Sequence, residues 1–290
     1  MTFDPFGDFE SRGYLRNTKG LKDPEAVRLF EHTAFRLNVA DALAALQAAR
    51  PLRYRDVLDT HKRLFGDVYP WAGQDREATA SRLAVGRAGR YDLFAHPQDA
   101  RRAVEHALDM AADPVRMRAK PGEIMGLLCH GHPFLEGNGR TLMTVHAELC
   151  RSAGFRVAWE GVAKPDYLAA LTRELEQPGK AFDTLLAPHL QRPAASVAQE
   201  AERLRLLPGL GPLAGPSAPP GAKPPATGVI PDAMHAPEPA TPPPVQASLI
   251  GRLQAFEDRM DAERKRAPKA DDTPGPEPDG TPRPRQGPKP

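Results

Sequence analysis

Apolar side chains recur every three or four positions over most of the first two-thirds of the chain, which is the spacing of amphipathic helices. Asp23-Pro24-Glu25 predicts a helix start, because an acidic cap precedes a proline at the first helical position. The same rhythm then continues on both sides of Pro51. The apolar positions that carry it are Ala26, Val27, Leu29, Phe30, Phe35, Leu37, Leu43, Leu46, Tyr54, Val57 and Leu58.

The middle of the chain predicts two helices separated by a loop. Residues 122–130 are rich enough in apolar side chains for a buried helix, and Pro133 ends it, because proline disfavours a helical conformation at the residue before it. A second helix is predicted from Asn138, a favoured N-cap type, to a left-handed stop at Gly154. Residues 97–110, 165–176 and 182–190 show further helical spacing, so the sequence predicts an all-α fold.

The last third of the chain has a different composition. Most of the 33 prolines lie after residue 207, and residues 208–245 predict a Pro-rich linker. Residues 246–266 have apolar positions on one face of a predicted amphipathic helix, and residues 267–290 return to proline, glycine and mixed charge, which predicts a disordered tail.

Composition excludes several classes of function. A net charge of +2 and 6% aromatic residues do not indicate a nucleic-acid binder. No apolar run is long enough to cross a bilayer, and the acidic residues 1–13 do not resemble a signal peptide, so we expect a soluble cytoplasmic protein with no membrane partner. Cys129 and Cys150 lie in apolar helical contexts and are interpreted as buried thiols of a reducing compartment.

The loop before the second central helix carries the candidate chemistry. Gly137 and Gly139 have no Cβ, so the backbone there can adopt positive φ and let an anion approach the amide hydrogens. Asn138 lies between them at a helix start, where free N–H groups and the helix dipole favour negative charge. Arg140 adds a permanent cation that can bind phosphate through two parallel hydrogen bonds. This combination predicts a phosphate site.

Two further side chains of this loop predict a metal and a base. Glu136 lies beside the predicted anion site, which is reasonable if Mg²⁺ lies between the carboxylate and the phosphates. His132 has an ordinary pKa near neutrality and could take a proton from an attacking hydroxyl.

Residues 132–140, His-Pro-Phe-Leu-Glu-Gly-Asn-Gly-Arg, resemble the signature of the Fic (Fido) family. Residues 61–73 are similar to its second recurrent segment, and Tyr14-Leu15-Arg16-Asn17 with Gly20-Leu21 resembles its usual lead-in. The resemblance covers roughly residues 10–190. It implies a Fic-type helical domain with a short β-hairpin, called the flap, expected between residues 82 and 96.

The expected organisation follows from the resemblance and the composition. Residues 1–51 are the N-terminal helical part of the fold, 52–192 the Fic catalytic domain and 193–207 a helical extension. Gly86 and Gly89 bracket a turn of the expected flap, while Leu93 and Phe94 offer apolar contacts.

The resemblance also implies an activity, the transfer of AMP from ATP to a Ser, Thr or Tyr hydroxyl of a target protein. By this analogy His132 deprotonates the hydroxyl, Glu136 holds Mg²⁺, and Phe134 anchors the loop. Gly137, Asn138, Gly139 and Arg140 would bind the phosphates. The target would dock along the flap by strand addition. A toxin acting in the producing bacterium and an effector delivered into another cell would share this loop.

One position departs from the family pattern. Many members carry a second arginine where this chain has Met143, which leaves open how the γ-phosphate is held; Arg151 or a flap arginine could substitute. The family's inhibitory motif is also not matched, because Ser196–Glu200 is followed by Ala201 and Thr172–Glu176 by Gln177. A separate antitoxin chain or no regulator are the open options.

Three alternatives are compatible with parts of the sequence. The same loop could transfer UMP or a phosphate. The domain could be an inactive scaffold whose Pro-rich tail recruits partners through polyproline helices. A zinc site could use His130, His132, Glu136 and His146, although their spacing is not a standard one.

Overall fold

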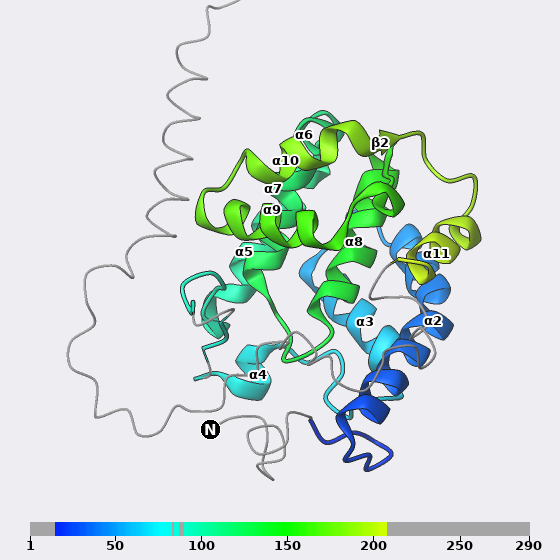
Figure 1. The fold of residues 1–290 in the computed structure, drawn as a ribbon, viewed down its shortest axis with the longest axis vertical. Helices are drawn as coiled ribbons and strands as arrows, with labels where there is room; N and C mark the ends of the chain where they lie inside the picture. Colours follow the sequence, from blue (N-terminus) through cyan, green and yellow to red (C-terminus); the bar gives the residue numbers. More distant parts are fainter. Residues whose placement is uncertain (1–14, 83, 87–89, 208–290) are drawn as a thin grey trace, which may run out of the picture. The chain divides into compact units, whose positions relative to one another are not determined.

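The computed structural model describes residues 15–82, 84–86 and 90–207, and these form a mostly helical fold (Figure 1). The predicted linker, amphipathic helix and tail at 208–290 lie outside the described residues. The helical class predicted from the apolar spacing is confirmed. The α-helices are α2 (Pro24–Ala48), α3 (Tyr54–Phe65), α4 (Arg76–Ala80), α5 (Pro97–Ala112), α6 (Pro114–Ala119), α7 (Pro121–Gly131), α8 (Asn138–Ser152), α9 (Lys164–Glu176), α10 (Ala181–Leu186) and α11 (Val197–Arg205).

Helix α7 lies at the centre of the described core. All of its residues are buried, as expected of a helix that is apolar on every side. It packs against α5 and α8, and α10 crosses its N-terminal end so closely that a Cβ on Gly122 would lie 2.2 Å from the backbone nitrogen of Asp183. Helix α2 packs along α3 and α8 and carries α11 on its other side (Figure 1). The loop between α7 and α8 is therefore held between two packed helices.

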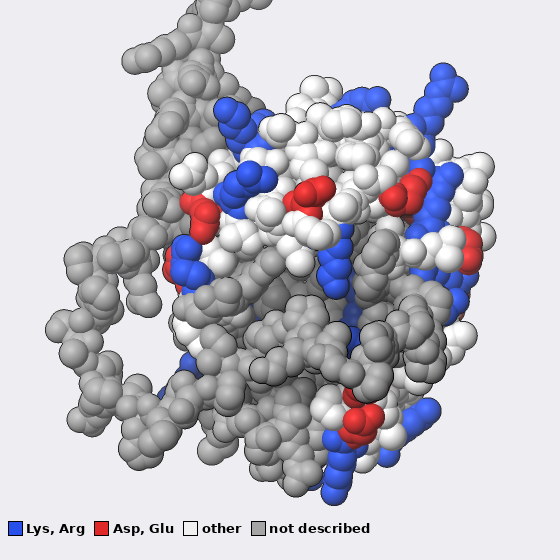
Figure 2. All heavy atoms as spheres, viewed as in Figure 1, with Lys and Arg blue, Asp and Glu red and all other residues white. Residues whose placement is uncertain are grey.

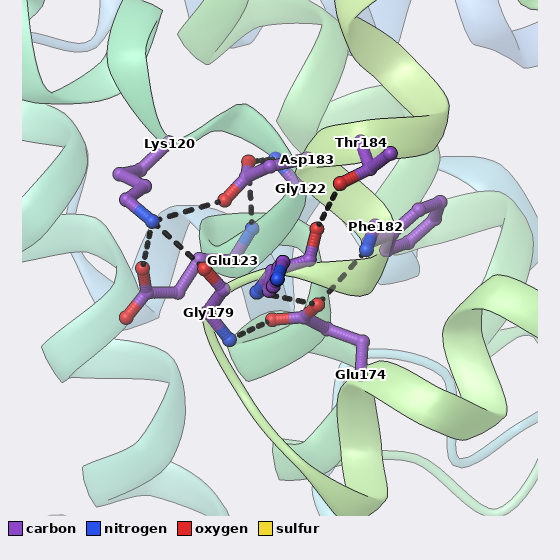
Figure 3. Close-up of polar contacts among 9 residues, drawn as sticks. Lys120, Gly122, Glu123, Glu174, Gly179, Phe182, Asp183 and Thr184 are labelled. Carbon is purple, nitrogen blue, oxygen red and sulfur yellow. Dashed lines mark hydrogen bonds and ion pairs between the residues drawn. The ribbon is translucent and has the colours of Figure 1, made fainter.

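A cluster of charged side chains fixes the N-terminal end of α7 (Figure 3). Asp183 Oδ1 accepts the backbone N–H groups of Gly122 and Glu123 at 2.6 and 3.3 Å. Glu174 accepts the N–H of Phe182 at 2.9 Å, and Lys120 Nζ donates to the carbonyl of Gly179 at 2.8 Å while lying 3.5 Å from Asp183. These contacts tie α9 and α10 to α7 and hold it at the end opposite the loop.

The one two-stranded antiparallel pair among the described residues joins β1 (Arg156–Val157) to β2 (Leu190–Gln191). The flap expected between residues 82 and 96 is a separate segment. In that stretch Arg90 alone of the described residues has a bridge, and residues 83 and 87–89 lie outside the described part. The end of this stretch is bound to the end of α7: Ala95 N–H donates to the His130 carbonyl, and the His130 ring contacts the Leu93 carbonyl.

The described surface is charged and mixed. On the face shown in Figure 2, Lys and Arg side chains are distributed over several elements with Asp and Glu between them. Cys129 and Cys150 are both free thiols in buried positions, as predicted. None of the helices in the described ranges is both long and apolar enough to cross a membrane.

Candidate active site

The loop between α7 and α8 begins and ends with residues in the left-handed region. Helix α7 ends at Gly131, and His132 follows with φ 41° and ψ 57°, so the helix stops before Pro133 as predicted. At the other end, Gly137 is the N-cap of α8 with φ 78°. A left-handed residue therefore defines each end of the loop.

Of the two loop glycines, Gly137 is the one that its surroundings require. Its φ is positive, and a Cβ there would lie 2.7 Å from Phe65 Cε2. Gly139 differs from the prediction, because it lies within α8, has no positive φ, and would place a Cβ in open space with nothing within 4 Å. The loop thus has a closed side at Gly137 and an open side at Gly139.

Asn138 does not cap α8 as predicted, because the helix begins one residue earlier at the Gly137 cap. Its side chain instead binds both backbone groups of Phe134: Oδ1 accepts the N–H at 2.9 Å and Nδ2 donates to the carbonyl at 2.6 Å. Phe134 is fully buried and stacks on the ring of His61, with centroids 3.8 Å apart. The Asn138 side chain therefore shapes the loop, and its backbone N–H is the group left for an anion.

His61 of α3 is a loop-holding residue to which sequence reasoning assigned no role. Its Nδ1 accepts the Gly73 N–H at 2.9 Å, so the proton must lie on Nε2, which donates to the Glu136 carbonyl at 3.0 Å. Burial lowers the pKa of His61 to about 3, with a smaller contribution from the Arg140 charge. A neutral imidazole is thus built into the support of the loop.

The ring of His132 is half-buried and stacks against Phe94, with centroids 4.2 Å apart. Neither ring nitrogen has a hydrogen-bond partner among the described residues, and neither is sealed from solvent. Burial, followed by the charges of Arg76 and His130, lowers the pKa of His132 to about 3. The imidazole is therefore neutral at physiological pH and available to accept a proton.

Glu136 reaches out of the loop and keeps 45% of its side chain exposed. Its Oε1 accepts the Gly137 N–H at 2.9 Å and lies 3.5 Å from Arg140 Nη2. Partial burial of the carboxyl group and the nearby Glu31 carboxylate raise the pKa of Glu136, whereas the Arg140 charge lowers it. Its second oxygen has no partner in the described part of the chain, so the carboxylate fits a hard cation such as Mg²⁺ that is also bound by phosphates.

Arg140 is almost buried, with 9% of its side chain exposed. Its Nη2 donates to Glu31 Oε2 at 3.0 Å, and its guanidinium lies over the Phe65 ring, 4.7 Å from the centroid. Glu31 also accepts a hydrogen bond from the hydroxyl of Tyr69. Arg140 Nη1, in contrast, is buried without a hydrogen-bond partner, which is unusual for a native structure and indicates a missing acceptor.

The first turn of α8 supplies further donors. Thr141 N–H donates to the Gly137 carbonyl at 3.0 Å, whereas the backbone N–H groups of Asn138, Gly139 and Arg140 have no acceptor within the described ranges. These three amides, the helix dipole and Arg140 Nη1 are groups of the kind that bind an anion such as phosphate.

Met143 and the arginines considered as substitutes for the missing second arginine decide how a third phosphate could be held. Met143 is buried in α8, with 8% of its surface exposed. Arg151 is paired with Glu148 at 2.7 Å and lies near the far end of the helix, too far to replace the missing arginine. Arg90 is paired with Asp92 and Glu176, while Arg82 is exposed.

Neither candidate inhibitory glutamate reaches Arg140. Ser196 caps α11 by accepting the Gln199 N–H, and Glu200 in that helix lies 3.8 Å from Arg203. Glu176 at the end of α9 pairs with Arg90. The carboxylates beside Arg140 are those of Glu31 and Glu136. The sequence did not predict the contact with Glu31, because 109 positions separate it from Arg140.

Two of the three histidines of the zinc alternative bind backbone carbonyls. His130 Nδ1 contacts the Leu93 carbonyl at 2.9 Å, and His146 Nε2 contacts the Pro121 carbonyl at 2.8 Å. Within the described ranges no three His, Cys, Asp or Glu side chains are grouped so that they could hold a metal ion.

Two curated proteins are similar to this chain. The chain is 31% identical over 171 residues to protein adenylyltransferase VbhT of Bartonella schoenbuchensis, a match that covers 58% of this chain and 35% of VbhT. It is 27% identical over 169 residues to Probable protein adenylyltransferase y4lH of Sinorhizobium fredii, covering 55% of this chain and 82% of y4lH. The chain thus spans about a third of the length of VbhT.

Solved structures share the fold. The N-terminal Fic domain of a VirB-translocated Bep effector protein from Bartonella quintana is 20% identical with a TM-score of 0.51, covering 64% of this chain and 92% of that one. A structure of such a domain with bound ADP, from the same organism, is also 20% identical with a TM-score of 0.50, covering 66% and 96%. The model of the Fic/DOC family matches residues 51–150, which include α3 and the whole loop. The chain therefore carries a domain of the Fic/DOC family.

Proposed function

We propose that this protein is a magnesium-dependent protein adenylyltransferase, which transfers AMP from ATP to a Ser, Thr or Tyr hydroxyl of a target protein. The observation that carries the proposal is the open start of α8, six to eight residues after a neutral His132. Three backbone N–H groups and the buried Arg140 Nη1 there have no acceptor among the described residues. Both curated relatives are named as protein adenylyltransferases, and a solved Fic domain of similar fold binds ADP, which supports a nucleotide as the ligand.

The proposed reaction needs one proton transfer and one displacement. The target hydroxyl oxygen attacks the α-phosphorus while His132 takes the hydroxyl proton. The bond between the α-phosphorus and the bridging oxygen to the β-phosphorus breaks, and pyrophosphate leaves. Because His132 is already neutral, no proton has to be removed from the imidazole before it acts. Positioning and charge neutralisation supply most of the remaining acceleration.

Charge neutralisation is assigned to Glu136, Arg140 and the amides of α8. Glu136 would hold Mg²⁺, which, when bound, neutralises phosphate oxygens and the leaving pyrophosphate. Arg140 Nη1 is assigned to a phosphate oxygen, while Nη2 stays on Glu31 and keeps the guanidinium in place. The N–H groups of Gly137, Asn138, Gly139 and Arg140 line the phosphates; the Gly137 amide must first release Glu136 Oε1.

The target is assigned to the stretch at residues 82–96, where an extended segment could add alongside the backbone. Tyr91 there has 58% of its surface exposed, and Arg90 anchors the stretch to Glu176 of α9. The proposed place of action is the cytoplasm, either of the producing bacterium, where a separate antitoxin chain would be needed, or of another cell that receives the protein.

The test is labelling of a lysate by the purified chain with Mg²⁺ and ATP labelled at the α-phosphate. We expect one or more labelled proteins, and loss of labelling in His132→Ala. His189→Ala in the 3-10 helix Ala187–His189 is the control and should label normally. Equal labelling by His132→Ala and wild type would show that the mechanism is wrong.

The same assay separates the alternatives by their donor. Parallel reactions with α-labelled GTP, CTP and UTP decide the nucleotide, and labelling from γ-labelled ATP would indicate phosphate transfer instead. Absence of labelling with every donor, in protein that still binds nucleotide, would favour the scaffold alternative.

A further inference from the structure

Arg76, the first residue of α4, is a fully buried arginine that binds the catalytic loop from behind. Its Nε donates to the His132 carbonyl at 2.7 Å, and its Nη2 donates to the carbonyls of Ala95 at 2.7 Å and Gly131 at 3.4 Å. Its own backbone N–H donates to the Pro133 carbonyl at 2.7 Å. One residue thus contacts three successive loop carbonyls and the segment that precedes α5.

The loop needs such a partner for two reasons. His132 has a φ of 41°, and a left-handed conformation costs roughly 1–2 kcal/mol for a residue with a Cβ, so something must hold it there. The carbonyls of Gly131 and His132 also lie at the C-terminal end of α7, where no further helical turn can supply donors. A guanidinium presents several donors in a fixed planar arrangement, which a lysine cannot do.

Arg76 also connects His132 to the side chain on which its ring rests. The Ala95 carbonyl is bound by Arg76, the Ala95 N–H donates to the His130 carbonyl at 2.8 Å, and the neighbouring Phe94 ring stacks on His132. The backbone and the ring of His132 are therefore fixed through the same buried group.

We propose that Arg76 is a positioning residue for His132: it fixes the left-handed backbone of His132 and joins it to Phe94–Ala95, so that the imidazole has one orientation. The inference rests on the proposed role of His132 as the base. The charged and titratable groups beside the His132 ring are Arg76 of α4 and His130 of α7, and the Arg76 charge additionally disfavours the imidazolium. A simple structural role would affect the whole fold instead of this one side chain.

The test compares Arg76→Lys and Arg76→Gln with the wild type by histidine-ring NMR and by kinetics. We expect the His132 ring resonance to shift in both variants, and kcat to fall by roughly ten- to a hundredfold, the usual consequence of a misplaced catalytic group. The affinity for ADP should stay within about twofold, because the start of α8 is unchanged. In Arg76→Gln, which lacks the charge, His132 should titrate at a higher pH than in Arg76→Lys.

Internal controls separate positioning from folding. The resonance of buried His146, which binds the Pro121 carbonyl, should not move if the fold is intact. Arg55→Gln, at an exposed arginine of α3 paired with Asp59, is the matched control and should leave His132 unchanged. An unchanged His132 resonance and kcat in both Arg76 variants would overturn the inference while leaving the transferase proposal in place.

Two outcomes need a separate readout. If no nucleotide transfer is found, the NMR and ADP measurements still test the position of His132. If both variants fail to fold, the wild-type protein decides: the Arg76 Nε–H should exchange slowly with solvent and show a through-bond coupling to the His132 carbonyl carbon. Rapid exchange without that coupling would refute the inference.

Discussion

The starts of α7 and α8 differ in whether the protein supplies an acceptor for their backbone N–H groups. At α7, Pro121 has no N–H, and the N–H groups of Gly122 and Glu123 are both accepted by Asp183 (Figure 3). At α8, the N–H groups of Asn138, Gly139 and Arg140 have no acceptor in the described part of the chain. The fold can supply a carboxylate to a helix start but, in the ranges described, supplies none to these three amides, which agrees with the proposal that this open end of α8 binds an external anion.

The two ends also share one feature, because a buried neutral histidine lies beneath each. His146 Nε2 contacts the Pro121 carbonyl at the closed end, and His61 Nε2 donates to the Glu136 carbonyl at the open end. Burial lowers the pKa of His146 to about 4 and that of His61 to about 3. Both histidines are therefore neutral in the folded protein near neutral pH.

The largest expected effect is acid destabilisation through these two histidines. In the unfolded chain they have a pKa of roughly 6.5, so below that pH the unfolded state binds more protons than the folded state. Stability is complete above about pH 6.5 and is lost as the pH falls toward the folded values, by roughly 2–3 kcal/mol per histidine at pH 4.5. Urea unfolding at pH 7.5 and 4.5 measures the loss.

His61→Gln and His146→Gln identify the source of the acid effect. Each variant loses one titrating group, so its stability should fall less between the two pH values than that of the wild type. A loss of the same size in both variants and the wild type would show that other groups cause the acid effect.

The next largest effect is expected from opening the closed end. Asp183→Ala leaves the N–H groups of Gly122 and Glu123 without their acceptor and should lower the free energy of unfolding by about 2–3 kcal/mol, as for charge-assisted hydrogen bonds. Nucleotide affinity of the folded protein should not change. Asp41→Ala, at an exposed site of α2, is the control and should change stability by less than about 0.5 kcal/mol.

The sequence predicted where α7 and α8 lie in the chain. It did not predict that the first N–H groups of α7 have an acceptor whereas those of α8 have none among the described residues. Helices α2, α7 and α8 follow from apolar spacing and from Asp23, Pro133 and Gly154, because these signals act within a few residues. Helix α4 was not predicted, since five residues do not form a stable helix alone and this one depends on the burial of Arg76.

The site was predicted only where its residues are adjacent in the chain. His132, Glu136 and Arg140 belong to one loop and were identified together. The partners Glu31, His61 and Arg76 come from α2, α3 and α4, and their contacts with the loop arise from packing across long sequence separations. Asn138 illustrates the same limit, because it was predicted to cap α8 but its side chain binds the backbone of Phe134.

Closing the open end should reduce nucleotide binding. Gly139→Asp places a carboxylate in the first turn of α8, where a Cβ meets no atom within 4 Å, so the substitution should fold and even gain about 0.5 kcal/mol from the helix dipole. The affinity for ADP should fall by about tenfold or more, because the new charge repels phosphate. Gly139→Asn has nearly the same shape without the charge, and equal affinities in the two variants would refute an anion site here.

The smallest expected effect concerns Glu31, whose buried carboxylate repels a phosphate bound near Arg140. Glu31→Gln keeps an amide oxygen for Arg140 Nη2 but removes a buried negative charge from the anion site. The affinity for ADP, measured by calorimetry without Mg²⁺, should therefore rise by roughly threefold to tenfold, as expected for one charge at several ångströms in a partly screened site. Weaker binding would mean that the Glu31 charge contributes mainly by holding Arg140 in place, and that the open end of α8 depends on α2 for its geometry as well as for its packing.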